Sequence, residues 1–155
     1  MQRQFSEVTI ANTIAFSPSG DAIYFSDSRR FVTWRFPVDE DGRLGERAIF
    51  RDYAAQRELP DGGCVDSEGC LWTAIIGSGR VVRCTPDGRV DRVITLPVSR
   101  PTCVCLGGPD LRTLYITTAR RFLTRGQLRE QPWAGSLLAI EVDVAGLPEQ
   151  RFGRD

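Results

Sequence analysis

An all-β fold made of short antiparallel strands is predicted by three features of the sequence. Short runs rich in Val, Ile, Phe, Trp and Tyr recur along the chain, and Gly, Pro and Asp separate them. No stretch has apolar residues at the 3.6-residue period of an amphipathic helix. The connections "SPSGD", "GSG" and "PDG" contain glycine at turn positions, where a positive φ costs glycine little.

The predicted strands fall into three successive units. A first unit over residues 10–52 is an antiparallel meander, with strands expected at 13–17, 22–27, 31–36 and 47–50. A second unit over 59–97 repeats the pattern, with strands expected at 63–67, 70–75, 80–85 and 92–97. A third unit over 100–152 has strands expected at 102–106, 113–118 and 136–142 and a weak one at 148–152. We treat these units as one domain.

The motifs "AIYF", "CLWT" and "TLYI" align Ile23, Leu71 and Leu114. Units of four strands that repeat at roughly 45 residues are typical of β-propeller blades. A β-sandwich built from hairpins is the alternative for the same strands. Propellers usually close with about 4 to 8 blades, so three blades would leave two open apolar faces. The sequence therefore predicts a partial propeller.

Residues 119–134 interrupt the third unit with a basic, polar segment that is expected to be a loop lying over one end of the blades. A loop of this length is either a functional lid or a solvated excursion.

Composition excludes several kinds of catalytic site. All 20 basic residues are arginine and the chain has no histidine, which rules out a Ser/His/Asp triad, a Cys/His pair and a His-ligated zinc site. The 20 basic and 20 acidic residues balance, so neither a nucleic acid nor a membrane surface is expected as a partner. The five cysteines form no CxxC pair and are expected to be small buried residues. No apolar run could span a bilayer and no signal peptide is recognisable, so we expect a cytoplasmic protein.

Two oxygen-bearing side chains occupy matching positions in the first two units. Asn12 lies eight residues before the turn glycine Gly20, and Asp61 lies eight residues before Gly69. In a propeller the first strand of each blade lines the channel, so these side chains should meet near its mouth, where they suit a hard or borderline divalent cation. The alternative is that both bond backbone amides where their strands begin.

Four segments carry a family resemblance: "NTIAFSPSGDAIYFSDS", "LPDGGCVDSEGCLWTAIIGSGRVVRCTPDGRV", "LPVSRPTCVCLGGPDLRTLYITTAR" and "WAGSLLAIEVDVAGLPEQRF". They resemble the second half of the family that contains regucalcin (senescence marker protein), gluconolactonases and luciferin-regenerating enzymes. The match runs from about residue 10 to residue 152. It implies half of a six-bladed propeller that hydrolyses a sugar lactone with one divalent metal ion (calcium, zinc, magnesium or manganese) in its channel.

The resemblance also implies roles for individual residues. Asn12 and Asp61 match metal ligands, and Asp61 matches the general base. The bound metal would polarise the lactone carbonyl and acidify a coordinated water. Arg100 and Thr102, at about the same level of the third unit, are expected to orient substrate hydroxyls. The third ligand of the family, a glutamate, and the substrate-binding arginine and asparagine belong to the first half of its members and have no counterpart here.

Two departures from the family pattern lie beside these residues: Thr13 stands where glycine is usual, and Gly63 stands where methionine is common. The expected function is therefore that of a metal-dependent lactonase half with little or no activity alone. The alternative is a non-catalytic metal-binding or structural β-module that forms a homodimer or pairs with a companion half-propeller.

Overall fold

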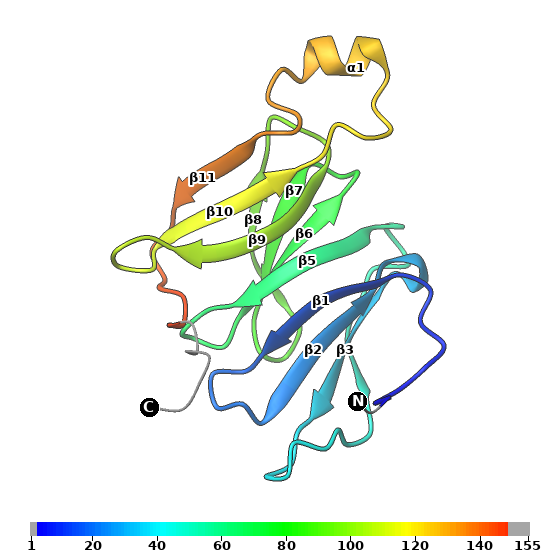
Figure 1. Ribbon diagram of the computed structural model, residues 1–155, viewed down its shortest axis with the longest axis vertical. Coiled ribbons are helices and arrows are strands. Elements are labelled where there is room, and N and C mark those ends of the chain that lie inside the picture. The colour runs from blue at the N-terminus through cyan, green and yellow to red at the C-terminus, as the bar shows by residue number, and fades with distance from the viewer. Residues whose placement is uncertain (1–2, 149–155) are drawn as a thin grey trace.

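The computed structural model describes residues 3–148, which form three antiparallel sheets arranged as neighbouring blades (Figure 1). The prediction of an all-β, partial β-propeller fold is therefore confirmed. Within residues 3–148, no helix has the length and hydropathy needed to cross a lipid bilayer.

The first blade contains four strands in sequential order: β1 (Ala11–Phe16), β2 (Ala22–Asp27), β3 (Val32–Pro37) and β4 (Ala48–Asp52). A single 3₁₀ turn, η1 (Ser28–Arg30), joins β2 to β3. The buried carboxylate of Asp27 fixes this turn by accepting hydrogen bonds from the backbone N–H groups of Thr9, Ile10 and Arg29. The segment before the blade is thereby tied to the β2–β3 corner.

The second blade has the same order: β5 (Leu59–Val65), β6 (Leu71–Ile76), β7 (Arg80–Cys84) and β8 (Val90–Thr95). The third contains β9 (Pro101–Gly107), β10 (Thr113–Thr118) and β11 (Leu137–Glu141) in the order β11-β10-β9. The strand expected at 148–152 falls almost wholly outside the described residues.

Strands β1, β5 and β9 are the innermost strands of the three blades and run side by side in the same direction (Figure 1). This arrangement is the one that radial blades require, because each blade uses its first strand to line the channel. β5 begins at Leu59, earlier than expected, because Leu59 and Pro60 pair with β6, and Asp61 and Gly62 form a bulge before the pairing resumes at Gly63.

Two apolar layers hold the blades together. Ala15 and Tyr24 of the first blade pack on Val65 and Leu71 of the second. Between the second and third blades lies a larger cluster that is centred on the fully buried indole of Trp72. Its other buried members are Ala74, Val81, Val104, Leu106, Leu114, Ile116, Val142 and Val144.

The second blade also contains a buried ionic cluster. Arg83 Nε donates to Asp66 Oδ2 at 2.8 Å, and the Trp72 indole N–H donates to the same oxygen at 2.8 Å. The guanidinium of Arg83 also binds the carboxylates of Glu68 and Asp91. Because every group in this cluster is paired, the buried charges of Arg83 and Asp66 are tolerated.

Two sequence expectations are wrong. Segment 119–134 contains a helix, α1 (Arg125–Glu130), which Thr124 and Gln127 cap reciprocally. One and a half turns are too short to show a 3.6-residue period, but the T-x-x-Q capping box was a usable signal. Cys103 and Cys105, expected to be buried, are exposed on β9, the innermost strand of the third blade.

Candidate metal and substrate site

All three inner strands are irregular near their first residues. The pairing register shifts between Asn12 and Ile14 in β1 and between Pro60 and Gly63 in β5. In β9 it shifts opposite Thr117 and Thr118, which leaves Thr102 outside the ladder. Such β-bulges turn side chains out of the normal alternation and are common next to functional sites. Asn12, Asp61 and Thr102, which their positions in the sequence place at one level of the channel, therefore each lie at a β-bulge.

Asp61 is half-buried, and within residues 3–148 its carboxylate accepts no hydrogen bond and forms no ion pair. Burial raises the pKa of Asp61, and the positive charge of Arg100 opposes that rise. The backbone of Asp61 is fixed, because its carbonyl oxygen accepts a hydrogen bond from the Thr13 hydroxyl of the neighbouring inner strand. The backbone at Asp61 is thus fixed while the carboxylate oxygen atoms have no hydrogen-bond partner among the described residues.

Asn12 is held by a hydrogen-bond chain to the second blade. The hydroxyl of Ser28 donates to the carbonyl oxygen of Pro60 at 2.6 Å, so it can only accept from the Asn12 amide nitrogen, 2.8 Å away. This arrangement orients the amide and leaves its oxygen without a hydrogen-bond partner among the described residues. Neither Asn12 nor Asp61 bonds a backbone amide with its side chain, so the strand-beginning alternative finds no support in this geometry.

The two glycines after Asp61 allow the inner strands to approach closely. A Cβ atom on Gly62 would lie 2.5 Å from the Cys103 sulfur, and one on Gly63 would lie 2.5 Å from the Trp72 carbonyl oxygen and 3.2 Å from the Thr13 methyl group. Thr13 is buried in this space with a φ of 35°, a left-handed conformation that favours glycine. Thr13 and Gly63, the two departures from the family pattern, are thus packed against each other.

Arg100 and Thr102 are placed differently from each other. The guanidinium of Arg100 lies over the Phe122 ring at 5.5 Å, and its Nε has no hydrogen-bond partner within the described chain. Thr102 shares a hydrogen bond of 2.8 Å with the Thr117 hydroxyl of its own blade. Arg100 therefore remains a candidate for contact with a substrate, whereas the hydroxyl of Thr102 is already engaged.

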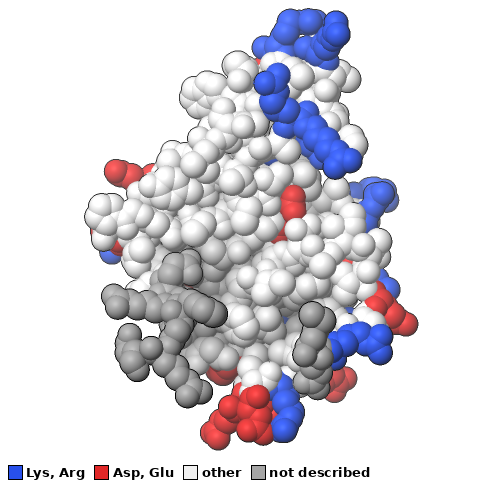
Figure 2. Space-filling view, viewed as in Figure 1, with Lys and Arg blue, Asp and Glu red and all other residues white. Residues whose placement is uncertain are grey.

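Segment 119–134 follows β10 and lies at the end of the third blade where β9 begins (Figure 1). The Ala119 N–H donates to the Arg100 carbonyl oxygen at 2.9 Å, and the Gln131 side chain accepts from the Ser99 N–H at 2.7 Å. Basic side chains cluster around α1 in the space-filling view (Figure 2). The segment therefore lies beside the start of β9, at one end of the third blade, and not over the ends of all three blades.

The chain supplies an incomplete set of metal ligands. Asn12 and Asp61 offer an amide oxygen and a carboxylate, which suit a hard divalent cation. Across residues 3–148 no group of three or more His, Cys, Asp or Glu side chains is arranged to hold a metal ion. Calcium takes about 6–8 oxygen ligands, so water, substrate or another polypeptide would have to supply the remainder.

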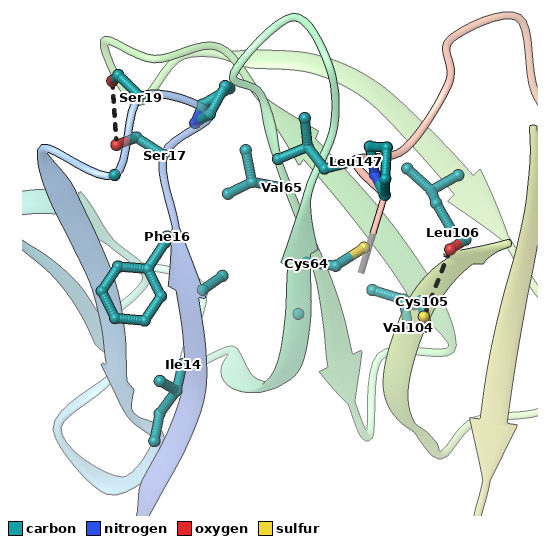
Figure 3. A pocket seen from close by; sticks show the side chains of 15 residues that line it. Ile14, Phe16, Ser17, Ser19, Cys64, Val65, Val104, Cys105, Leu106 and Leu147 are labelled. Carbon is teal, nitrogen blue, oxygen red and sulfur yellow. Dashed lines mark hydrogen bonds between the residues drawn. The ribbon is translucent and has the colours of Figure 1, made fainter. Parts of the chain in front are cut away.

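A groove of about 630 Å³ runs across the later halves of the inner strands (Figure 3). Ala15, Val65 and Leu106 contribute to its lining, and no lining residue is charged. Asn12, Asp61 and Thr102 do not line it, so the candidate ligands and this groove occupy different levels of the open channel.

Comparisons with known proteins agree with this architecture. The family model described as "SMP-30/Gluconolactonase/LRE-like region" matches residues 1–120. The chain is 43% identical to a 6-deoxy-6-sulfogluconolactonase of Pseudomonas putida over 147 residues, which are 94% of this chain and 50% of that protein. It is 33% identical to the regucalcin of Gallus gallus, over 97% of this chain and 51% of that protein.

Among solved structures, the regucalcin of Agrobacterium tumefaciens, described as a calcium-binding protein, matches with a TM-score of 0.93 and 30% identity. That match covers 99% of this chain and 52% of the regucalcin chain. The chain thus spans about half the length of the relatives it matches. With three propeller blades, matching inner-strand bulges and a family match over most of its length, the chain belongs to the SMP-30/gluconolactonase/LRE-like family.

Proposed function

We propose that this chain carries part of the active site of a divalent-metal-dependent sugar-lactone hydrolase, in which Asn12 and Asp61 bind the metal ion and Asp61 serves as general base. The observation that supports this most is the state of these two side chains. Both lie at bulges of adjacent inner strands, both are positioned by Thr13 and Ser28, and both keep oxygen atoms without hydrogen-bond partners among the described residues.

The bound metal ion would supply Lewis-acid polarisation of the lactone carbonyl and a more acidic water. Asp61 takes a proton from the attacking water as the oxygen of that water bonds to the carbonyl carbon. The ring C–O bond then breaks, its electron pair stays on the ring oxygen, and Asp61 returns its proton to this oxygen. The product is the open hydroxy acid.

The substrate we propose is a sugar lactone with an anionic substituent. Arg100 and Arg121 lie over the same Phe122 ring, at 5.5 and 4.6 Å, at the end of the channel where Asp61 is found. Guanidinium groups bind sulfonate and phosphate oxygens through charge-assisted hydrogen bonds. The relative from Pseudomonas putida is named for a sulfonated gluconolactone, which makes that lactone and plain gluconolactone the first pair to compare.

Because the chain spans about half the length of its relatives, metal binding and lactone turnover are measured separately. Calorimetric titration with calcium, zinc, magnesium and manganese is expected to show binding in the wild type and a loss of at least tenfold in affinity in Asp61→Asn. Glu46→Gln, an exposed carboxylate outside the site, is the matched control and should bind as the wild type does. Lactone hydrolysis is followed by acid release under the same conditions.

Hydrolysis that depends on the metal and disappears in Asp61→Asn would support the proposal. Arg100→Gln should then reduce turnover of the sulfonated lactone more than that of gluconolactone. Metal binding without turnover in the presence of a companion half-propeller would identify a non-catalytic metal-binding module. Absence of both binding and turnover in the folded chain, with and without that companion, would overturn the proposal.

A further inference from the structure

Each blade carries the same small–aromatic pair on the face that points toward the next blade. The cross-strand partners are Ala15 with Tyr24 in the first blade and Cys64 with Trp72 in the second. Both aromatic rings are buried against the following blade, with exposed fractions of 2% and 0%. The third blade repeats the pair as Cys105 with Tyr115, but Tyr115 is 37% exposed because no blade follows within the described residues.

The opposite faces carry a matching set of apolar pairs. Val65 with Leu71 in the second blade and Leu106 with Leu114 in the third are cross-strand partners that pack on the preceding blade. The equivalent pair of the first blade is Phe16 with Ile23.

Phe16 is 52% exposed and the neighbouring Ile14 is 67% exposed. Figure 3 shows both side chains on the side of β1 that faces away from β5. Among residues 3–148, the first blade therefore leaves exposed the kind of surface that the other two blades bury against the blade before them.

The rest of this face of the first blade is packed in the same way as the face that the second blade buries against the first. Phe5, in the segment before the first blade, stacks on Phe36 and meets Phe25 edge-on. Tyr53, in the segment before the second blade, packs in the same way on Ile75 and Val82. Phe5 thus covers β2 and β3 of the first blade and leaves the residues of β1 exposed. In the second blade Tyr53 likewise covers β6 and β7, and the residues of β5 remain free to pack on the first blade.

The two open faces of one chain are therefore complementary to each other. Inside the chain, an aliphatic pair of the Val65–Leu71 type packs on a small–aromatic pair of the Ala15–Tyr24 type, twice. We propose that two copies of this chain associate so that Phe16 and Ile23 of each copy pack on Cys105 and Tyr115 of the other. A two-fold axis along the channel relates the copies, and both open faces are covered at once.

The curvature of the blades agrees with a closed ring of two copies. The three blades superimpose with a TM-score of 0.93 on a chain about twice as long, of which they cover 52%. Two copies therefore replace the two halves of a relative, and no face of the ring remains open. The dimer also places a second Asn12 and Asp61 around the same channel, which adds oxygen ligands to a set that one chain leaves incomplete.

This inference does not rest on the proposed lactonase activity, and its test does not measure activity. Light scattering coupled to size-exclusion chromatography should give twice the 17.3 kDa of the chain for the wild type. Phe16→Glu and Tyr115→Arg should each shift the protein to the monomer mass. Val93→Glu, an exposed apolar position on β8 away from both faces, is the matched control and should stay dimeric. Circular dichroism confirms that each variant is folded.

Mixing the two monomeric variants tests which faces meet. A mixed dimer has one contact between the introduced glutamate and the introduced arginine, which attract each other, and one wild-type contact, so the dimer mass should return in the mixture only. A wild-type chain that stays monomeric over the accessible concentrations would overturn the proposal, and a companion polypeptide would then have to cover the two faces. A Tyr115→Arg variant that remains dimeric would also overturn it, because the contact would then join two first blades.

Discussion

Replacing Gly62 by alanine should force β5 and β9 apart at the level of Asp61. The new Cβ would meet the Cys103 sulfur at 2.5 Å, its Cβ at 2.7 Å and its backbone Cα at 2.9 Å. To reach an ordinary separation of about 3.5 Å, the two strands must move by about 1 Å. Overpacking of this kind typically costs about 1–3 kcal/mol. Since a backbone atom is among those contacted, we expect the free energy of unfolding to fall by about 3 kcal/mol, the upper end of that range.

For a chain of this size, each kcal/mol lowers the melting temperature by about 2–4 °C, so the expected decrease is roughly 6–12 °C. Urea unfolding of wild type and variant measures the change in the free energy of unfolding directly. Replacing Cys103 by glycine in the Gly62→Ala background removes two of the three contacted atoms and should restore part of the loss.

The matched control is Gly126→Ala in α1, where a Cβ has open space apart from the Thr124 hydroxyl at 3.8 Å. Alanine in a helix is favoured over glycine by about 1 kcal/mol, so this variant should be neutral or slightly stabilised. The argument from close strand approach fails if Gly62→Ala unfolds within about 0.5 kcal/mol of the wild type, the range of an ordinary surface change.

Three further outcomes are expected. Arg83→Met leaves the buried Asp66 carboxylate uncompensated, so urea titration should show a loss of about 3–5 kcal/mol, and Asp66→Asn in the same chain should recover part of it. Thr13→Val keeps the shape of the side chain but removes the hydroxyl that binds the Asp61 carbonyl oxygen, so about 1–3 kcal/mol should be lost, and a neutral result would mean that water replaces this bond. Although burial raises the pKa of Asp27, the hydrogen bonds from the backbone N–H groups of Thr9, Ile10, Arg29 and Arg30 together outweigh it and hold that pKa below 3.8. Stability from this carboxylate is present above pH 3.8 and is lost as the pH falls through the folded-state value, so Asp27→Asn should flatten the acid limb of the stability curve, and an unchanged limb would contradict the assignment.

The parts of the fold that could be predicted from the sequence are those fixed by local patterns. The strands expected at 22–27 and 113–118 coincide with β2 and β10, because both are β-branched and aromatic runs between unambiguous turns. The start of β5 was missed because Pro60 pairs with β6 and a bulge that contains Gly62 follows it. This pairing depends on the neighbouring strands, which no local pattern contains.

In the candidate site, too, the positions of the residues could be predicted from the sequence, whereas their contacts across blades could not. Spacing to the turn glycines placed Asn12 and Asp61 at equivalent positions, and both lie at bulges of neighbouring inner strands. Their roles as metal ligands, and those of Arg100 and Thr102 toward substrate, stay predictions. The contacts of Ser28 with Pro60 and of Thr13 with Asp61 join residues 32 and 48 positions apart. Contacts between residues so far apart in the sequence can be identified only in the folded structure, where the blades pack against each other.

The central position of the second blade has a consequence for local opening of the protein. From Leu71 to Ile75 every residue of β6 is buried, and the Arg83–Asp66 ion pair joins β7 to the end of β5 across it. Amide hydrogens of β6 should therefore exchange with solvent only through global unfolding, whereas those of β4 and β11 should exchange through smaller local fluctuations. Asp61 lies in the bulge of β5, and β5 pairs with β6 on both sides of that bulge, so fraying of β4 or β11 would leave the strand that carries Asp61 in place.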